Sequence, residues 1–194
     1  MTTIQKLLNQ LVDAYRSIEF DFNEILNDGL CPDAIAQLES HLPFKLPSDV
    51  REMYEWRNGV TIGMKCTDGF LWDYAFLDFE AAVKNYLYLS ERKAFDPRTN
   101  EHLWFPIFQN VGGDTYSVDC SSEGTHGAIW RTSTSGSEAV IRYASLADMI
   151  VTIIKCVEGG AYYFADGYWE ADLGLQKAIS RKYNPDIASW QRGA

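Results

Sequence analysis

The sequence predicts an α+β protein, in which a mostly antiparallel sheet of about five to six strands is flanked by N-terminal and C-terminal helices. Two observations lead to this prediction. Both ends of the chain carry apolar residues at the spacing of amphipathic helices, whereas the middle consists of short runs rich in β-branched and aromatic residues. The 194 residues contain no internal repeat and no low-complexity linker, so we expect a single domain over residues 1–194.

The N-terminal segment is predicted to form three helices. The first covers residues 4–18, where apolar side chains fall on one stripe. Residues 27–29 predict a turn, and a second helix starts at Pro32, because the first helical turn tolerates the missing amide of proline. The third helix is expected to end at residues 58–59, since Asn and Gly can both take the left-handed conformation that closes a helix.

The middle of the chain is predicted to form strands and hairpins, because β-branched and aromatic runs are separated there by Gly, Asp, Ser and Asn clusters. The runs cover residues 60–65, 70–76, 102–108, 115–120, 127–133 and 138–144. Asp78 and Ser145 are good N-caps for two further helices, one between the strands and one after them. Gly159-Gly160 can stop the later helix, or residues 161–164 can continue it after a kink. Two short helices over residues 173–182 and 185–190 complete the chain.

The charge of the chain bears on its partners. There are 17 Lys and Arg residues against 27 Asp and Glu residues, which gives a formal net charge of -10. Such a field repels phosphate backbones and anionic lipids, so we expect no nucleic-acid or membrane partner, whereas a basic protein would be attracted. The sequence shows no signal peptide, and its four cysteines form no C-x-x-C pair. These features favour a cytoplasmic location.

Signatures of catalysis are scarce. The sequence contains no phosphate-binding loop, dinucleotide fingerprint, H-E-x-x-H or G-x-S-x-G motif, and its three histidines are far apart along the chain. The one cluster that could support an enzyme comprises Asp114, Asp119, Cys120 and His126. We therefore expect a non-catalytic protein with no cofactor and no metal site.

Five residues are candidates for contact with a partner. Asp114, Asp119 and Glu123 lie near hairpin loops and could present carboxylates to a cationic surface or hold a metal. Turn chemistry explains these acids more economically, because Asp hydrogen-bonds its own backbone in tight turns. Trp72 and Trp104 are candidate anchors, since Trp dominates binding hot spots, although core packing is expected to claim most aromatic side chains.

Several short motifs occur in an order typical of one family. They are Glu39 on a helix, Leu46-Pro47, Asn58-Gly59, Pro106-Ile107, Gly113-Asp114 and Val118-Asp119. Together they resemble the SUKH superfamily, which includes bacterial immunity proteins and fungal regulators of cell-wall synthesis. The resemblance covers a core of about residues 34–163. It departs from the family at GAIWR, where the last motif strand is expected, and in a C-terminal extension over about residues 164–194.

The resemblance implies an α+β fold and a binding function. Many bacterial members act as antidotes that bind polymorphic toxins, often nucleases. An acidic chain suits this role, because a basic toxin domain would be steered toward it electrostatically. The alternative implied by the fungal members is an intracellular adaptor or regulator that uses the same scaffold on an endogenous partner.

Overall fold

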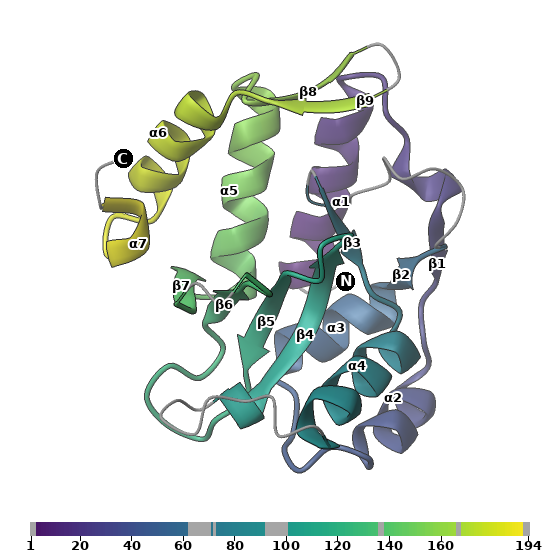
Figure 1. The fold of residues 1–194 in the computed structure, drawn as a ribbon. Coiled ribbons are helices and arrows are strands. Elements are labelled where there is room, and N and C mark those ends of the chain that lie inside the picture. The colour runs from purple at the N-terminus through teal and green to yellow at the C-terminus, as the bar shows by residue number, and fades with distance from the viewer. Residues whose placement is uncertain are drawn as a thin grey trace.

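A central antiparallel sheet organises the fold (Figure 1). The computed structural model describes residues 3–61, 71, 73–91, 101–135, 138–165 and 168–191. Within these residues, the sheet has five strands in the order β3-β4-β5-β6-β7. Their bounds are Tyr74–Phe76, Trp104–Asn110, Thr115–Asp119, Ile129–Thr132 and Val140–Tyr143. The predicted antiparallel sheet is therefore confirmed, although the predicted strand over residues 60–65 lies largely outside the described residues.

The helices surround this sheet and confirm the predicted α+β class. Those before and beside the sheet are α1 (Thr3–Arg16), α2 (Pro32–Glu39), α3 (Ser48–Trp56) and α4 (Phe79–Glu91). Those after it are α5 (Leu146–Glu158), α6 (Leu173–Tyr183) and α7 (Ala188–Gln191). Two short 3₁₀ turns cover Phe22–Glu24 and Glu101–Leu103. The predicted Ser145 cap is present, because its side chain accepts a hydrogen bond from the Asp148 amide.

The two faces of the sheet carry different residues. On the face toward α5, which we call the inner face, Phe105, Val118, Ile129 and Tyr143 lie opposite one another in register and are buried. They belong to a hydrophobic core that extends from Ile4 in α1 to Trp190 in α7. The opposite, outer face takes the alternate positions of the same strands. It carries Trp104, Pro106, Thr115, Ser117, Trp130 and Thr132.

The prediction of a turn at residues 27–29 and of a helix end at residues 58–59 is wrong. These residues form a two-stranded antiparallel ribbon, in which β1 (Leu26–Asp28) pairs with β2 (Arg57–Val60). The Asn27 side-chain amide donates a hydrogen bond of 2.9 Å to the Asn58 carbonyl and fixes the ribbon. Gly59 does take the left-handed conformation, with φ of 73°, but it does so within β2.

Helix α5 ends at Glu158 with Gly159 as its C-cap, so the predicted stop at Gly159-Gly160 is confirmed. The alternative, a continuation over residues 161–164, is wrong. This segment is β8 (Tyr162–Ala165), which pairs with β9 (Tyr168–Ala171) in a hairpin. Tyr162 is buried while Tyr163 is 42% exposed, which is the alternation of a strand. The Trp169 ring packs edge-on against Tyr15 of α1 at 5.1 Å between centroids, so the hairpin is anchored to the N-terminal helix.

The C-terminal helices pack on the body of the protein rather than projecting from it (Figure 1). The Asn184 side chain, which follows α6, donates a hydrogen bond to the Thr152 hydroxyl of α5 at 2.9 Å. The Trp190 indole of α7 donates one to the Arg142 carbonyl of β7 at 2.6 Å. These contacts place α6 and α7 beside α5 and the β7 edge of the sheet.

Candidate functional site

Asp114 lies at the β4–β5 turn and is held by the neighbouring strand. Its carboxylate pairs with the Arg131 guanidinium at 3.0 Å and accepts hydrogen bonds from the Ser133 hydroxyl and the Thr134 amide at 2.9 and 3.0 Å. Burial tends to raise the pKa of Asp114, but the Thr134 and Ser133 hydrogen bonds and the Arg131 charge lower it below its usual value. The side chain therefore joins the hairpin to β6 in its ionised form.

Asp119 is the last residue of β5, at the other end of the strand from Asp114, and Glu123 lies in the loop between β5 and β6. Asp119 is fully buried, and its carboxylate accepts hydrogen bonds from the Ser121 amide at 2.8 Å and from the Thr125 hydroxyl. Glu123 is exposed. Strand β5 thus separates Asp114 from the other two acids. The Asp119 carboxylate binds the Ser121 amide and the Thr125 hydroxyl of the loop that follows it, which agrees with the turn chemistry predicted for this residue. Glu123 alone of the three presents an exposed carboxylate.

Trp104 forms a stacked pair with Trp130 on the outer face. The two rings lie 4.2 Å apart between centroids, at an interplanar angle of 19°. Strand β5 runs between them, and its residue opposite Trp130 is the small Ser117, over which two indoles can meet. The Nε1 atoms of both indoles are buried without a hydrogen-bond partner. Trp104 is only 4% exposed, yet it lies outside the main hydrophobic core.

A cavity of about 530 Å³ lies beside this tryptophan pair, between the outer face and α4. Trp104 and Pro106 form part of its wall, and Tyr88 of α4, which is 51% exposed, stands at its edge. Glu101 is the charged residue in the wall, which contains no Lys or Arg among the described residues. We call this region the outer-face site. Trp72, the other candidate anchor, lies outside the described residues.

Sequence reasoning missed Trp130, Tyr88 and Glu101 as members of this site. Trp130 lies in a predicted strand, but its contact with Trp104 depends on a register that the sequence does not reveal. Tyr88 lies on α4 away from the buried residues of the helix, which are Phe79, Ala82, Val83 and Tyr86. Its exposure follows from the helical period once the inward stripe is known.

The residues of the possible enzyme cluster do not form a reactive arrangement. Cys120 and His126 line the same small cavity of about 400 Å³, but Asp114 is at the far end of β5. Burial and the nearby Asp119 charge raise the pKa of the Cys120 thiol, which disfavours the nucleophilic thiolate. The His126 Nδ1 atom hydrogen-bonds the Ser121 carbonyl. In the described part of the chain, no three His, Cys, Asp or Glu side chains are grouped closely enough to hold a metal ion.

The antiparallel sheet with helices on both sides defines the class of the protein as α+β. A search with family models identifies residues 29–152 as a match to the SMI1 / KNR4 family (SUKH-1), and the chain belongs to this family. No curated protein sequence matches the chain. Family membership supports a role of the immunity-protein or regulator type, and members are commonly protein-binding immunity proteins. Among the described residues, no helix is both long enough and apolar enough to cross a membrane.

Proposed function

We propose that the chain is a non-catalytic, cytoplasmic immunity protein that binds a basic toxin domain and thereby neutralises it. The family match over residues 29–152 carries this proposal. The net charge of -10 supports a basic partner, since complementary fields speed association and orient the two proteins. The raised pKa of the Cys120 thiol disfavours the one nucleophile of the possible enzyme cluster.

The outer-face site is the contact surface that we propose. It combines aromatic side chains with a wall that is free of positive charge among the described residues. Tyr88 offers a half-exposed ring as an anchor, and the exposed Glu138 precedes Ala139 of the cavity wall. A tyrosine anchor and a carboxylate at the rim of one cavity are suited to a lysine- or arginine-bearing surface. Glu123, on the β5–β6 loop, is a further exposed carboxylate that could meet a basic partner.

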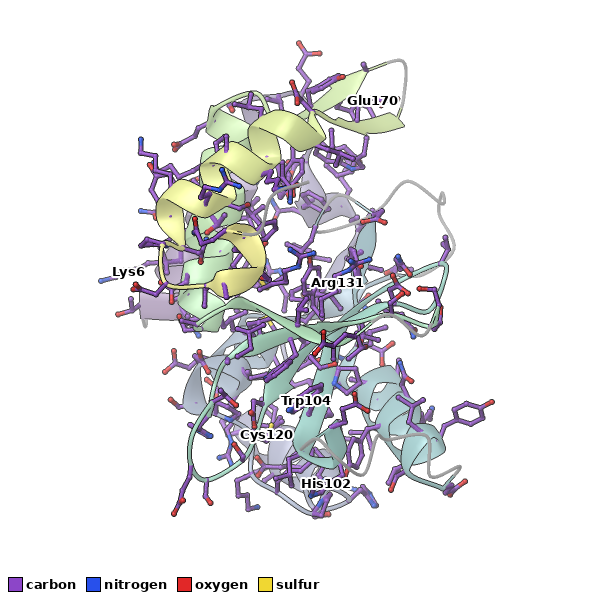
Figure 2. The ribbon with its side chains drawn as sticks, turned by 60° about the vertical axis from the view of Figure 1, so that its left-hand side comes forward. Lys6, His102, Trp104, Cys120, Arg131 and Glu170 are labelled. Carbon is purple, nitrogen blue, oxygen red and sulfur yellow. The ribbon has the colours of Figure 1, made fainter. Side chains whose placement is uncertain are left out.

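The test is protection of cells that express a toxin domain encoded beside this chain. We expect the unmodified chain to restore growth and the double variant Tyr88→Ala, Glu138→Lys to lose protection, with binding weakened about a hundredfold. The matched control is Glu170→Lys, which makes the same charge change on β9, far from Trp104 (Figure 2). It should protect normally.

The outcomes separate the class of function from its location. Protection that survives the double variant would place the contact surface elsewhere. Failure of the unmodified chain to protect, together with a growth defect on its deletion in cells that lack any toxin, would replace the immunity function by the regulator function of the fungal type.

A further inference from the structure

A second cavity lies inside the protein, between the inner face of the sheet and the C-terminal helices. Its volume is about 480 Å³, within the range of about 300–1,000 Å³ that is typical of small-molecule sites. Strands β3 to β8 and helix α5 supply one side of it, and α6 and α7 supply the other. Leu173, which is 57% exposed, and the exposed Asp73 mark its opening.

The charge of this cavity is opposite to that of the chain. Arg131, Arg142 and Lys177 line it, against the single carboxylate of Asp73. Arg131 is already occupied, because it pairs with Asp114 and donates a hydrogen bond to the Tyr74 hydroxyl at 3.1 Å. Two cations therefore remain available in a protein whose net charge is -10.

The Arg142 side chain is held in place beside the cavity, but one of its hydrogen-bond donors has no acceptor. Its guanidinium lies over the Trp190 ring at 4.4 Å, and the Trp190 indole donates a hydrogen bond to the Arg142 carbonyl. The Nε atom of Arg142 is nevertheless buried and has no hydrogen-bond partner. A buried donor without a partner is costly, and within the described residues the guanidinium also forms no ion pair, so an anion in the cavity would compensate its charge. Lys177 likewise forms no ion pair within the described residues.

The rest of the lining suits the body of an organic molecule. Met149, Ile153 and Trp190 supply apolar and aromatic surface. Tyr143 and Tyr162 supply hydroxyl groups, and burial raises the pKa of each, so both phenols are neutral donors at physiological pH. Apolar walls with a few convergent polar groups are characteristic of ligand sites.

We propose that this cavity binds a small organic anion, whose carboxylate or phosphate group contacts Arg142 and Lys177 while its apolar or aromatic body lies against Met149, Ile153 and Trp190. Both anionic groups offer the same charged oxygens to a guanidinium and an ammonium. The cavity is separate from the outer-face site, because Arg131 and Trp130 are adjacent in β6 and point to opposite faces of the sheet. Figure 2 shows Arg131 on the side of the C-terminal helices.

Titration calorimetry of the full chain with phenyl phosphate, benzoate and neutral benzamide tests the proposal. We expect one of the two anions to bind and benzamide to bind at least about tenfold more weakly, because a charge-assisted hydrogen bond is lost. Phenyl phosphate and benzoate distinguish a phosphate ligand from a carboxylate ligand. Binding of neither anion, or equal binding of benzamide, would overturn the proposal.

Two substitutions on the same helix locate the binding. Lys177→Gln should weaken binding of the anion at least about tenfold, whereas Lys182→Gln should leave it unchanged, because Lys182 is exposed and does not line the cavity. Thermal unfolding of both variants reports whether they are folded, and both positions are outside the core. Equal binding by the two variants would overturn the assignment to this cavity, and this result is independent of toxin protection.

Discussion

The Arg51 guanidinium of α3 binds both oxygens of the buried Glu39 carboxylate, at the end of α2. Its Nη2 atom lies 2.6 and 2.7 Å from the two carboxylate oxygens, and Glu39 is 2% exposed. The same carboxylate accepts hydrogen bonds from the Leu46 amide at 2.8 Å and from Lys45 Nζ at 3.0 Å. One side chain thus joins two helices and the loop between them.

Replacement of Glu39 should destabilise the fold. We expect Glu39→Gln to lower the free energy of unfolding by about 1–3 kcal/mol, because the amide keeps one acceptor for Leu46 but loses the charge that faces Arg51. Urea denaturation at neutral pH measures the change. Glu55→Gln, at an exposed position of α3, is the control and should cost less than about 0.5 kcal/mol.

The same ion pair predicts a dependence on pH. Burial tends to raise the pKa of Glu39, but the hydrogen bonds from Leu46, Lys45 and Arg51 and the Arg51 charge lower it below its usual value. Its contribution is therefore present above the pKa of the unfolded state and is lost as the pH falls through the lower, folded-state pKa. The stability difference between the unmodified chain and Glu39→Gln should shrink as the pH falls from neutral through the lowered pKa of Glu39. A constant difference would contradict this assignment.

Gly59 and Gly124 share a backbone conformation but differ in the space around them, so they can be compared directly. Their φ angles are 73° and 72°, so a side chain at either position meets the same backbone strain of about 1–2 kcal/mol. A Cβ at Gly59 would also lie 2.3 Å from the Asp78 amide nitrogen, whereas a Cβ at Gly124 meets nothing within 4 Å. Gly59→Ala should therefore lower the melting temperature well beyond the decrease caused by Gly124→Ala. Similar decreases in melting temperature for the two variants would show that β2 and the start of α4 can move apart at little cost in free energy.

Trp190 should contribute strongly to stability. It is 5% exposed, and it holds β7 through its indole hydrogen bond and the Arg142 guanidinium. Trp190→Ala should cost about 3–5 kcal/mol, as for other buried aromatic residues, and Trp190→Phe should cost less because the ring contact remains. Tyr183→Ala, at a 38% exposed position of α6, is the comparison. Chemical denaturation that fails to separate the two alanine variants would mean that α7 is only loosely attached.

Replacement of Asp119 should lower the stability of the protein, whereas replacement of Glu123 should leave it nearly unchanged. Asp119→Ala leaves the Ser121 amide without its acceptor in a buried loop and should cost about 1–3 kcal/mol of stability. Glu123→Ala removes an exposed carboxylate and should change stability by less than about 0.5 kcal/mol. Denaturation compares the two, and the reverse order would contradict the structural role of Asp119.

The sequence predicted the elements whose signal is local. The stripe of α1 and the Ser145 cap of α5 are readable without any tertiary information, and they are confirmed. The β1–β2 ribbon was missed because β1 has three residues, too few for a period, and its partner is about thirty residues away along the chain. The β8–β9 hairpin was missed because its first strand, YYFA, has no alternation of apolar and polar residues and begins only four residues after an apolar helix ends.

The sites depend on tertiary contacts to different degrees. The turn chemistry of Asp119 could be predicted because its partners Ser121 and Thr125 lie in the loop that follows it. The partners of the Asp114 carboxylate lie on and after β6, 17 to 20 residues along the chain, and were not predicted. The Trp104–Trp130 stack required the register of three strands. The inner cavity brings together Arg142 and Lys177, which no spacing rule connects. Their proximity follows from the docking of α6 on α5, a long-range contact.

The residues that line the inner cavity come from two different parts of the chain. Tyr74, Arg131 and Arg142 belong to the segment that matches the family, while Lys177 and Trp190 come after it. Substitutions in the last twenty or so residues could therefore change which molecule is accepted without disturbing the shared scaffold or its outer face. A relative with a different C-terminal segment would keep the lining residues from the sheet but have other residues in place of Lys177 and Trp190. The ligand could therefore differ between relatives even where the protein partner stays the same.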